Sequence, residues 1–389
     1  MKVGIDGGCW TNWRGYGRYT RNLLSALAAR GDGNEYLMFL DEAGAREAQV
    51  PDGIRVVPVA LSQAPGEAAS ASGRRSVADL LRMSWAVARQ RLDVFFFPSV
   101  YTYFPLLRPV PAVVAIHDVI AERHPDMIFP KKSLELFWRA KVSLAIRQAR
   151  YVLTVSDHAK AGILEQFSLD ERRIRVILES HDPVFHKLPD ARDPALVLPQ
   201  LGLALGRRYI IYVGGLSPHK NLGTLIEAFR RVAPHCADHD LLLVGNFRSD
   251  VFFSAYEALR EQVTASGLDG RVVFTGFVSD EDLAELYNRS DLLVLPSLEE
   301  GFGLPAFEAA ACGTPGIVSE TGPAAALLGD AVVSFAPRDV HALERLLRTL
   351  LQDDDRRTRM CEAALSRSAE YSWDRSAASL ANMLREAAR

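Results

Sequence analysis

The chain has 389 residues, 48% of them hydrophobic and 24% charged, with a formal net charge of −3. This length exceeds what one hydrophobic core usually supports, so we expect two domains. The near-neutral balance argues against a nucleic-acid partner. Four well-separated cysteines offer no metal-ligand spacing, and neither a signal-peptide pattern nor an apolar run of roughly 18–20 residues is found, so we expect a cytoplasmic protein.

Apolar runs alternate with helix-period segments from the N-terminus onward. We expect strands at 2–6, 36–40, 54–59, 94–99, 112–118, 151–156 and 174–178. We expect helices at 17–30, 75–91, 131–149 and 157–167. Continuous apolar strands separated by helices predict a parallel sheet covered on both faces.

Residues 186–206 carry three prolines without a strong period and predict an interdomain linker. Further strands are then expected at 209–215, 241–246, 272–277, 292–297, 316–319 and 331–335. Further helices are expected at 221–233, 251–266, 280–289, 305–312 and 339–352. The prediction is an α/β fold of two doubly wound, Rossmann-like domains facing across a cleft, with ligands beyond the carboxyl ends of the strands.

A glycine-rich loop follows the first strand. Gly15 and Gly17 would let backbone amides approach an anion at the start of the next helix. The alternative is an ordinary loop whose glycines supply positive φ. Because Asp41 follows the second strand, a dehydrogenase that binds NAD also stays open here.

The stretch "YVGGLSPHKNLG" places Lys220 at a helix start, where the helix dipole disfavours a cation. An anion opposite the ammonium would offset that cost, with His219 as a second donor; an exposed lysine on a solvated loop is the alternative. His117 ends an expected strand, at the edge where a binding residue belongs. Asp118 beside it could orient the ring or cap the next segment, although a lone histidine is often structural.

The stretch "LEEGFGLPAFE" encloses a turn between Glu300 and Glu308. Pro305 suits the first turn of a helix, so this turn presents backbone amides to a ligand. Amides fit a pyrophosphate and carboxylates fit vicinal hydroxyls, a combination that describes a nucleotide sugar. The two acids could instead be the acid and base of a glycosidase, but that enzyme has no use for the lysine loop.

Two charged stretches have weaker functional interpretations. The run "QDDDRR" (352–357) looks like a metal–nucleotide motif, but a solvated helix terminus is favoured. The basic helix at 131–150 and "GRR" at 73–75 could contact a membrane surface or an acidic acceptor, although basic residues on a packed helix are commoner.

Taken in order, these motifs resemble the retaining GT-B glycosyltransferases of family four, which have an E-x7-E motif and include mannosyl- and glucosyltransferases. The resemblance covers nearly the whole chain, including "VSDHAK", "LLLVGN" and "VVFTGFVSDEDLAELYNRSDLLVLPS". It implies an acceptor-binding domain at 1–185, the linker, a nucleotide-sugar-binding domain at 207–368, and a last helix at 369–389 that crosses back to the first domain.

The resemblance also implies roles for individual residues. Lys220 would contact the donor diphosphate, Glu300 the hydroxyls of the transferred sugar, and Glu308 the ribose diol. His117 would face the donor sugar near the reacting carbon, so His117, Lys220 and Glu300 are the expected catalytic residues. Contacts through the backbone are expected from Phe302, Gly303, Leu304, Val278, Gly15 and Gly17.

One position departs from the family pattern. Gly215 stands where many members carry a second phosphate-binding arginine, and His219 or Arg18 would have to replace it. Members work without a bound metal or other cofactor, and the leaving diphosphate takes the acceptor proton. The donor, GDP-mannose or a UDP-sugar, is not fixed, and the acceptor (a glycan, a lipid-linked or a small molecule) would meet loops such as 60–76 and 100–110. A GT-B nucleotide-sugar epimerase and a non-catalytic nucleotide-sugar-binding protein stay open as alternatives.

Overall fold

The computed structural model describes residues 1–12, 15–63, 76–189, 192–194, 198–246 and 254–389. The chain forms two compact units, one of Met1–Glu179 together with Ser372–Arg389 and one of Ser180–Tyr371. Among the helices described, none has both the length and the apolar character that crossing a membrane requires.

The first unit is built on a seven-stranded parallel sheet with the order β3-β2-β1-β4-β5-β6-β7. Its strands are β1 (Lys2–Asp6), β2 (Glu35–Asp41), β3 (Ile54–Val59), β4 (Val94–Phe97), β5 (Ala112–Ala115), β6 (Ala149–Thr154) and β7 (Ile174–Val176). β4 and β5 are buried along their whole length, as expected for strands covered on both faces. The strand order reverses between β1 and β4, which makes a switch point there.

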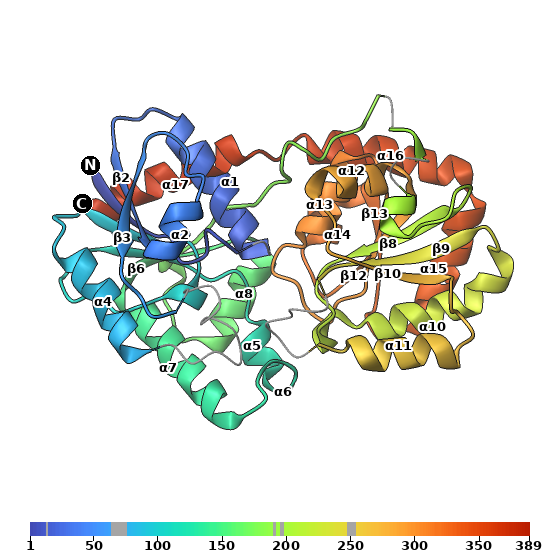
Figure 1. Ribbon diagram of the computed structural model, residues 1–389, viewed down its shortest axis with the longest axis horizontal. Helices are drawn as coiled ribbons and strands as arrows, with labels where there is room; N and C mark the ends of the chain where they lie inside the picture. Colours follow the sequence, from blue (N-terminus) through green and yellow to red (C-terminus); the bar gives the residue numbers. More distant parts are fainter. Residues whose placement is uncertain (13–14, 64–75, 190–191, 195–197, 247–253) are drawn as a thin grey trace. The chain divides into compact units, whose positions relative to one another are not determined.

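The helices of this unit come from both ends of the chain. They are α1 (Gly15–Ala29), α2 (Glu42–Glu47), α4 (Val77–Ala88), α5 (Ile120–Arg123), α6 (Pro125–Ile128), α7 (Lys132–Gln148), α8 (Asp157–Gln166) and α17 (Trp373–Ala388). α17 packs against α1, β4 and β5, and Figure 1 shows it in red beside the blue α1. Its buried residues, including Leu380 and Leu384, make the last helix part of the core of the first unit.

The second unit contains a six-stranded parallel sheet with the order β10-β9-β8-β11-β12-β13. Its strands are β8 (Arg208–Val213), β9 (His239–Val244), β10 (Val272–Gly276), β11 (Ser290–Leu295), β12 (Gly316–Ser319) and β13 (Val332–Phe335). Its helices are α10 (Leu222–Val232), α11 (Tyr256–Ala265), α12 (Asp280–Asn288), α13 (Leu304–Ala311), α14 (Ala324–Leu328), α15 (Val340–Gln352) and α16 (Asp354–Ser368). The predicted α/β class, with two doubly wound parallel sheets, is confirmed.

One expected helix begins later than predicted, and the acidic run takes the form that the sequence favoured. The helix expected at 251–266 begins at Tyr256, and residues 251–253 lie outside the described ranges. The acidic run at 352–357 is a helix terminus, because the Asp353 carboxylate caps α16 by accepting a hydrogen bond from the Arg356 amide at 2.8 Å.

The described part of segment 186–206 packs on α12 in the second unit. The Leu188 amide donates to Asn288 Oδ1 at 3.0 Å, and Arg192 Nε donates to Glu285 Oε1 at 3.0 Å. Arg192 also pairs with Asp282 at 2.7 Å. These contacts attach the proline-bearing segment to the second sheet unit rather than leaving it unpacked.

Candidate active site

The carboxyl edge of the second sheet has a switch point between β8 and β11. These strands are parallel neighbours, and the chain leaves β8 toward β9 on one side, whereas β12 lies on the other side of β11. The loops after both strands therefore leave the sheet at one place, where open α/β sheets bind their ligands.

Glycines end the strands on one side of this switch point. The Gly214 amide donates to the Val244 carbonyl at 2.9 Å, and the Gly245 amide to the Gly276 carbonyl at 3.1 Å. A Cβ at Gly245 would stand 1.9 Å from the Gly214 oxygen, so no larger residue fits. Gly214 itself has a φ of 152°. The edge beside β8 is therefore bare backbone, which a ligand can approach closely.

The loop after β8 meets the loop after β11 through their charged side chains. Lys220 Nζ lies 2.7 Å from Glu300 Oε1, which also accepts a hydrogen bond from Ser297 Oγ at 2.7 Å. The side chains of Lys220 and Glu300 are 19% and 20% exposed, so both can reach a ligand. The structure thus places together two residues that the sequence assigned to a diphosphate and to a sugar.

Backbone contacts hold the same two loops together. The Leu298 amide donates to the carbonyl of His219, whose side chain is buried. The Gly215 carbonyl accepts a hydrogen bond from the Tyr212 hydroxyl at 2.6 Å. Lys220 ends a short 3-10 turn, Pro218–Lys220, just before α10. The partly exposed lysine therefore stands at the end of this loop, just before the helix.

The turn after Glu300 leads into α13 as predicted. Gly303 has a φ of 87°, and Pro305 occupies the first turn of α13. The amides of Phe302, Gly303 and Leu304 stand at the N-terminal end of this helix, where backbone amides have no intrahelical acceptor. Such amides, with the positive end of the helix dipole, suit an anion.

Glu308 has different surroundings from Glu300. It is the fifth residue of α13, beyond the first turn, and it is 1% exposed. Its Oε2 accepts a hydrogen bond from the Tyr287 hydroxyl at 3.0 Å. Its expected contact with a ribose diol stays a prediction. Val278 is also buried, between β10 and the Ser279 cap of α12.

The first unit holds the remaining predicted site residues. α1 begins at Gly15, and neither Gly15 nor Gly17 has positive φ. A Cβ at Gly17 would stand 1.8 Å from the Asn12 carbonyl oxygen, whereas a Cβ at Gly15 would meet nothing within 4 Å. Gly17 therefore allows the loop after β1 to approach the helix closely.

His117 follows β5 and uses both ring nitrogens. Nδ1 lies 3.2 Å from Glu179 Oε1, and Nε2 lies 2.8 Å from the Pro98 carbonyl oxygen. A carboxylate and a carbonyl both accept hydrogen bonds, so the protonated ring, which donates from both nitrogens, satisfies both partners. Burial lowers the pKa of His117, but the Glu179 carboxylate, the Pro98 carbonyl and Asp118 together outweigh burial, and the pKa is raised above its ordinary value.

Glu179, not Asp118, orients the His117 ring. Asp118 Oδ1 accepts from the Ile120 amide at 3.0 Å and so begins α5. The Tyr19 ring packs edge-on against the imidazole, with centroids 4.4 Å apart. Sequence reasoning missed Glu179, although an acid directly after the apolar run 174–178 is a signal of a strand-end side chain.

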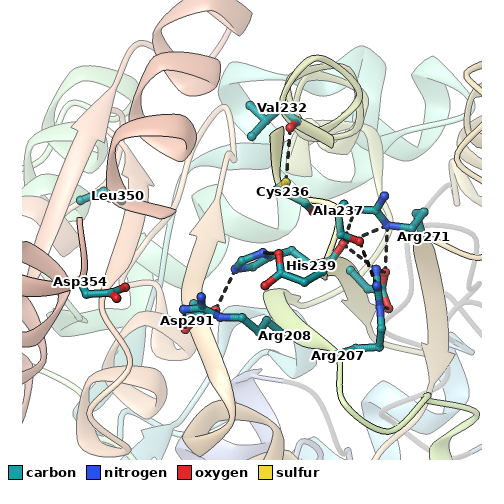
Figure 2. Close-up of polar contacts among 12 residues, drawn as sticks. Arg207, Arg208, Val232, Cys236, Ala237, His239, Arg271, Asp291, Leu350 and Asp354 are labelled. Atoms are coloured by element: carbon teal, nitrogen blue, oxygen red, sulfur yellow. Dashed lines mark hydrogen bonds and ion pairs between the residues drawn. The ribbon is translucent and has the colours of Figure 1, made fainter. Parts of the chain in front are cut away.

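A second charged cluster, drawn in Figure 2, lies at the amino ends of the strands of the second sheet. Arg207 and Arg271 pair with Asp240, and Arg208 and His239 pair with Asp291. Burial raises the pKa of Asp291, but hydrogen bonds from His239 and Arg208 outweigh it and the pKa is lowered to about 2. Because these residues lie at the amino ends of the strands, they hold the sheet together rather than face a ligand.

Some functional expectations fall outside what the structure describes. Most of the predicted acceptor loop 60–76, with "GRR" at 73–75, lies outside the described ranges. In the loop 100–110, the Leu106 amide donates to Gln148 Oε1 at 3.0 Å. Within the described ranges no group of three or more His, Cys, Asp or Glu side chains gathers as a metal site would require.

Two protein-family models match the chain and together span most of it. The model described as Glycosyltransferase Family 4 matches residues 13–183, and the model described as Glycosyl transferases group 1 matches residues 197–367. The first covers most of the first sheet unit, and the second runs from before β8 into α16 and includes Lys220, Glu300 and Glu308.

Curated relatives and solved structures agree with these matches. An Escherichia coli "O-antigen chain mannosyltransferase B" is 27% identical over 75% of this chain and 74% of its own length. The chain spans between 31% and 63% of the length of seven other curated relatives. A Thermosynechococcus elongatus sucrose-phosphate synthase has a TM-score of 0.77 at 20% identity, over 99% of this chain and 98% of its own. Anabaena HepE in complex with UDP-glucose has a TM-score of 0.73 at 20% identity, over 99% and 100%.

Proposed function

Because the chain belongs to the GT-B glycosyltransferases, with a Family 4 domain followed by a group 1 domain, we propose that it is a retaining, metal-independent hexosyltransferase. Its donor is a nucleotide diphosphate hexose of the mannose or glucose type. Its acceptor is a hydroxyl of a glycan, a lipid-linked or a small molecule.

The ion pair of Lys220 and Glu300 at the switch point carries this proposal. A diphosphate and a hexose are neighbours in the donor, and the cation and the carboxylate that suit them are 2.7 Å apart. A bound diphosphate competes for Lys220, which leaves Glu300 to accept hydrogen bonds from sugar hydroxyls. The amino end of α13 and the glycine edge beside β8 add backbone donors and room.

The proposed chemistry requires charge stabilisation more than a protein base. The bond between the anomeric carbon and the diphosphate oxygen breaks while the acceptor oxygen approaches the same face of the sugar. The leaving oxygen takes the acceptor proton. Lys220 and the amides before α13 stabilise the negative charge that develops on the leaving group, since preorganised donors act most strongly there. His117, which pairs with Glu179, lies at the carboxyl ends of the strands of the first sheet.

The relatives support the donor class. A relative aligned over 75% of this chain is described as a mannosyltransferase, and a protein of the same fold was solved with UDP-glucose. We therefore give mannose and glucose donors the first place in a test, with both GDP and UDP as the nucleotide.

The test is an incubation of the purified chain with GDP- and UDP-hexoses, with and without hydroxyl acceptors. We expect nucleoside diphosphate release that depends on acceptor, a product with the anomeric configuration of the donor by NMR, and full activity in EDTA. An inverted product or loss of activity in EDTA contradicts the mechanism. Epimerised donor without acceptor identifies an epimerase, and tight donor binding without turnover across the acceptors identifies a binding protein.

We also propose that α7 contacts an anionic membrane surface, at the cytoplasmic face. Leu136 is 71% and Phe137 51% exposed, close to the exposed Lys131 and Lys132. Apolar side chains beside cations are typical of helices that lie on anionic lipid.

Sedimentation with vesicles checks this contact. The chain should bind vesicles that contain anionic phosphatidylglycerol more strongly than neutral ones, and the double variant L136S/F137S should bind at least several-fold less. Leu365→Ser removes an apolar side chain that is 36% exposed, on α16, and serves as the control. Equal binding by the double variant and the control refutes the contact.

A further inference from the structure

Asn221 is the residue between Lys220 and α10, and its backbone is unusual. Its φ is 57° and its ψ 34°, the left-handed conformation. Among the described residues, Asn221 is the one residue other than glycine whose φ is positive. Asparagine tolerates this conformation better than other residues with a Cβ, but it still costs free energy. Backbone strain of this kind commonly lies at functional sites.

The side chain of Asn221 links three loops at the carboxyl edge of the second sheet. Its Nδ2 donates to the Pro296 carbonyl at 2.9 Å, in the loop after β11 that bears Glu300. The same Nδ2 donates to the Pro337 carbonyl, in the loop after β13. Its Oδ1 accepts from Thr224 Oγ1 at 2.8 Å, on the first turn of α10.

Asn221 does not act as an ordinary helix cap. An N-cap side chain normally accepts a hydrogen bond from a backbone amide of the first turn, and Asn221 makes no such bond. Its side-chain amide instead donates to the Pro296 carbonyl, in the loop after β11 that also bears Glu300. The left-handed backbone is what allows this direction, because it turns the chain between the 3-10 turn and α10.

We propose that Asn221 is a positioning residue that fixes Lys220 against Glu300 for binding and turnover of the donor. This inference rests on the proposed function, since it concerns the same site. A glycine at this position would supply the left-handed backbone but none of the three hydrogen bonds. The side chain, rather than the φ angle alone, is therefore what the site uses.

Three variants separate these contributions. Asn221→Gly keeps the backbone conformation and removes all three bonds, and Thr224→Val removes only the bond to Oδ1. Asn288→Ala is the matched control, because Asn288 also uses its side-chain amide on backbone groups, donating to the carbonyls of His186 and Ala284 and accepting from Leu188. These hydrogen bonds join the segment after Ser180 to α12, and none of them involves a loop of the switch point.

We expect N221G to lower kcat/KM for the donor on the order of 10²-fold, the scale of a small misplacement of a catalytic group. T224V should lose less than tenfold, and N288A should stay within twofold of wild type. The melting temperatures of N221G and N288A should fall by similar amounts, which separates positioning from stability.

A double-mutant cycle with Lys220→Ala gives the decisive readout. If Asn221 acts through Lys220, N221G should cost little more in the K220A background, measured as kcat/KM and as binding of UDP and GDP by calorimetry. Additive losses, or wild-type kinetics in N221G, overturn the inference while leaving the proposed function in place. A wild-type chain that neither binds UDP or GDP nor turns over any donor overturns both.

Discussion

At the scale of single residues, the candidate side chains of each unit have hydrogen-bond partners within that unit. Glu300 accepts from Lys220 and from Ser297 with the same oxygen, and the ring nitrogens of His117 lie within hydrogen-bond distance of Glu179 and of the Pro98 carbonyl. A half-buried charge held in this way keeps one rotamer. These partners therefore explain how the side chains of Glu300 and His117 stay oriented although both lie on loops.

The His117–Glu179 pair predicts a pH-dependent contribution to stability. The pKa of His117 is raised in the folded chain, so the pair stabilises fully below the ordinary histidine value and progressively less as pH rises through the folded value. Glu179→Gln should lower the free energy of unfolding by roughly 2 kcal/mol at pH 6, the scale of one charged hydrogen bond.

Denaturant unfolding at pH 6 and pH 9 measures this difference. The gap between wild type and E179Q should shrink at the higher pH, and NMR titration should show a lower pKa for His117 in the variant. Glu165→Gln removes the exposed partner of Arg123 and should change stability by less than about 1 kcal/mol. A gap of the same size at both pH values contradicts the assignment of a charged His117.

At the scale of elements, the start of α1 distinguishes two glycines that look equivalent in the sequence. Gly17→Ala would place a methyl group 1.8 Å from the Asn12 carbonyl oxygen, so the loop after β1 must move. We expect a loss of about 1–3 kcal/mol, as for overpacked sites. Gly15→Ala meets nothing within 4 Å and replaces glycine by a better helix former, so stability should be unchanged or higher.

Thermal unfolding of the two variants checks this contrast. A melting temperature that falls for G17A and not for G15A supports the close approach of loop and helix. Equal melting temperatures would show that the loop adjusts without cost.

The order of elements was largely predictable from the sequence, but their contacts were not. Strand ends, the proline at the start of α13 and the helix start after Lys220 follow from local patterns. That Lys220 and Glu300 touch depends on β8 and β11 being neighbours, and a single sequence does not fix strand order. Two other contacts join segments that are far apart in the chain: the pair of His117 with Glu179, and the hydrogen bond from Asn221 to Pro296. Local sequence patterns therefore cannot predict them.

At the scale of the whole molecule, charged residues lie at both the amino and the carboxyl ends of the strands of the second sheet. We assign the first group to stability and the second to ligand binding. The amino edge holds Asp291 at a pKa of about 2, below its unfolded value near 4. Its stabilisation is therefore present above about pH 4 and is lost as pH falls toward 2. The carboxyl edge instead holds the half-buried Lys220 and Glu300.

Asp291→Asn should accordingly reduce stability without affecting the donor. After discounting for partial exposure, we expect a loss of about 1–2 kcal/mol at pH 7 that disappears near pH 2. Denaturant unfolding across this range, with calorimetric titration of UDP and GDP at pH 7, gives both readouts. Weakened nucleotide binding in D291N would mean that the amino ends of the strands take part in binding. That result would contradict the assignment of Asp291 to stability alone.

The proposal that the switch point at β8 and β11 binds and activates a nucleotide sugar is tested most directly by Lys220→Ala. Lys160→Ala is the matched control, because Lys160 also forms a 2.7 Å ion pair, with Glu171, but on α8 in the first unit. We predict that acceptor-dependent kcat/KM falls by at least ~10²-fold in K220A, the scale of losing one preorganised donor, while K160A stays near wild type. A K220A enzyme within a few-fold of wild type would contradict the assignment of this site.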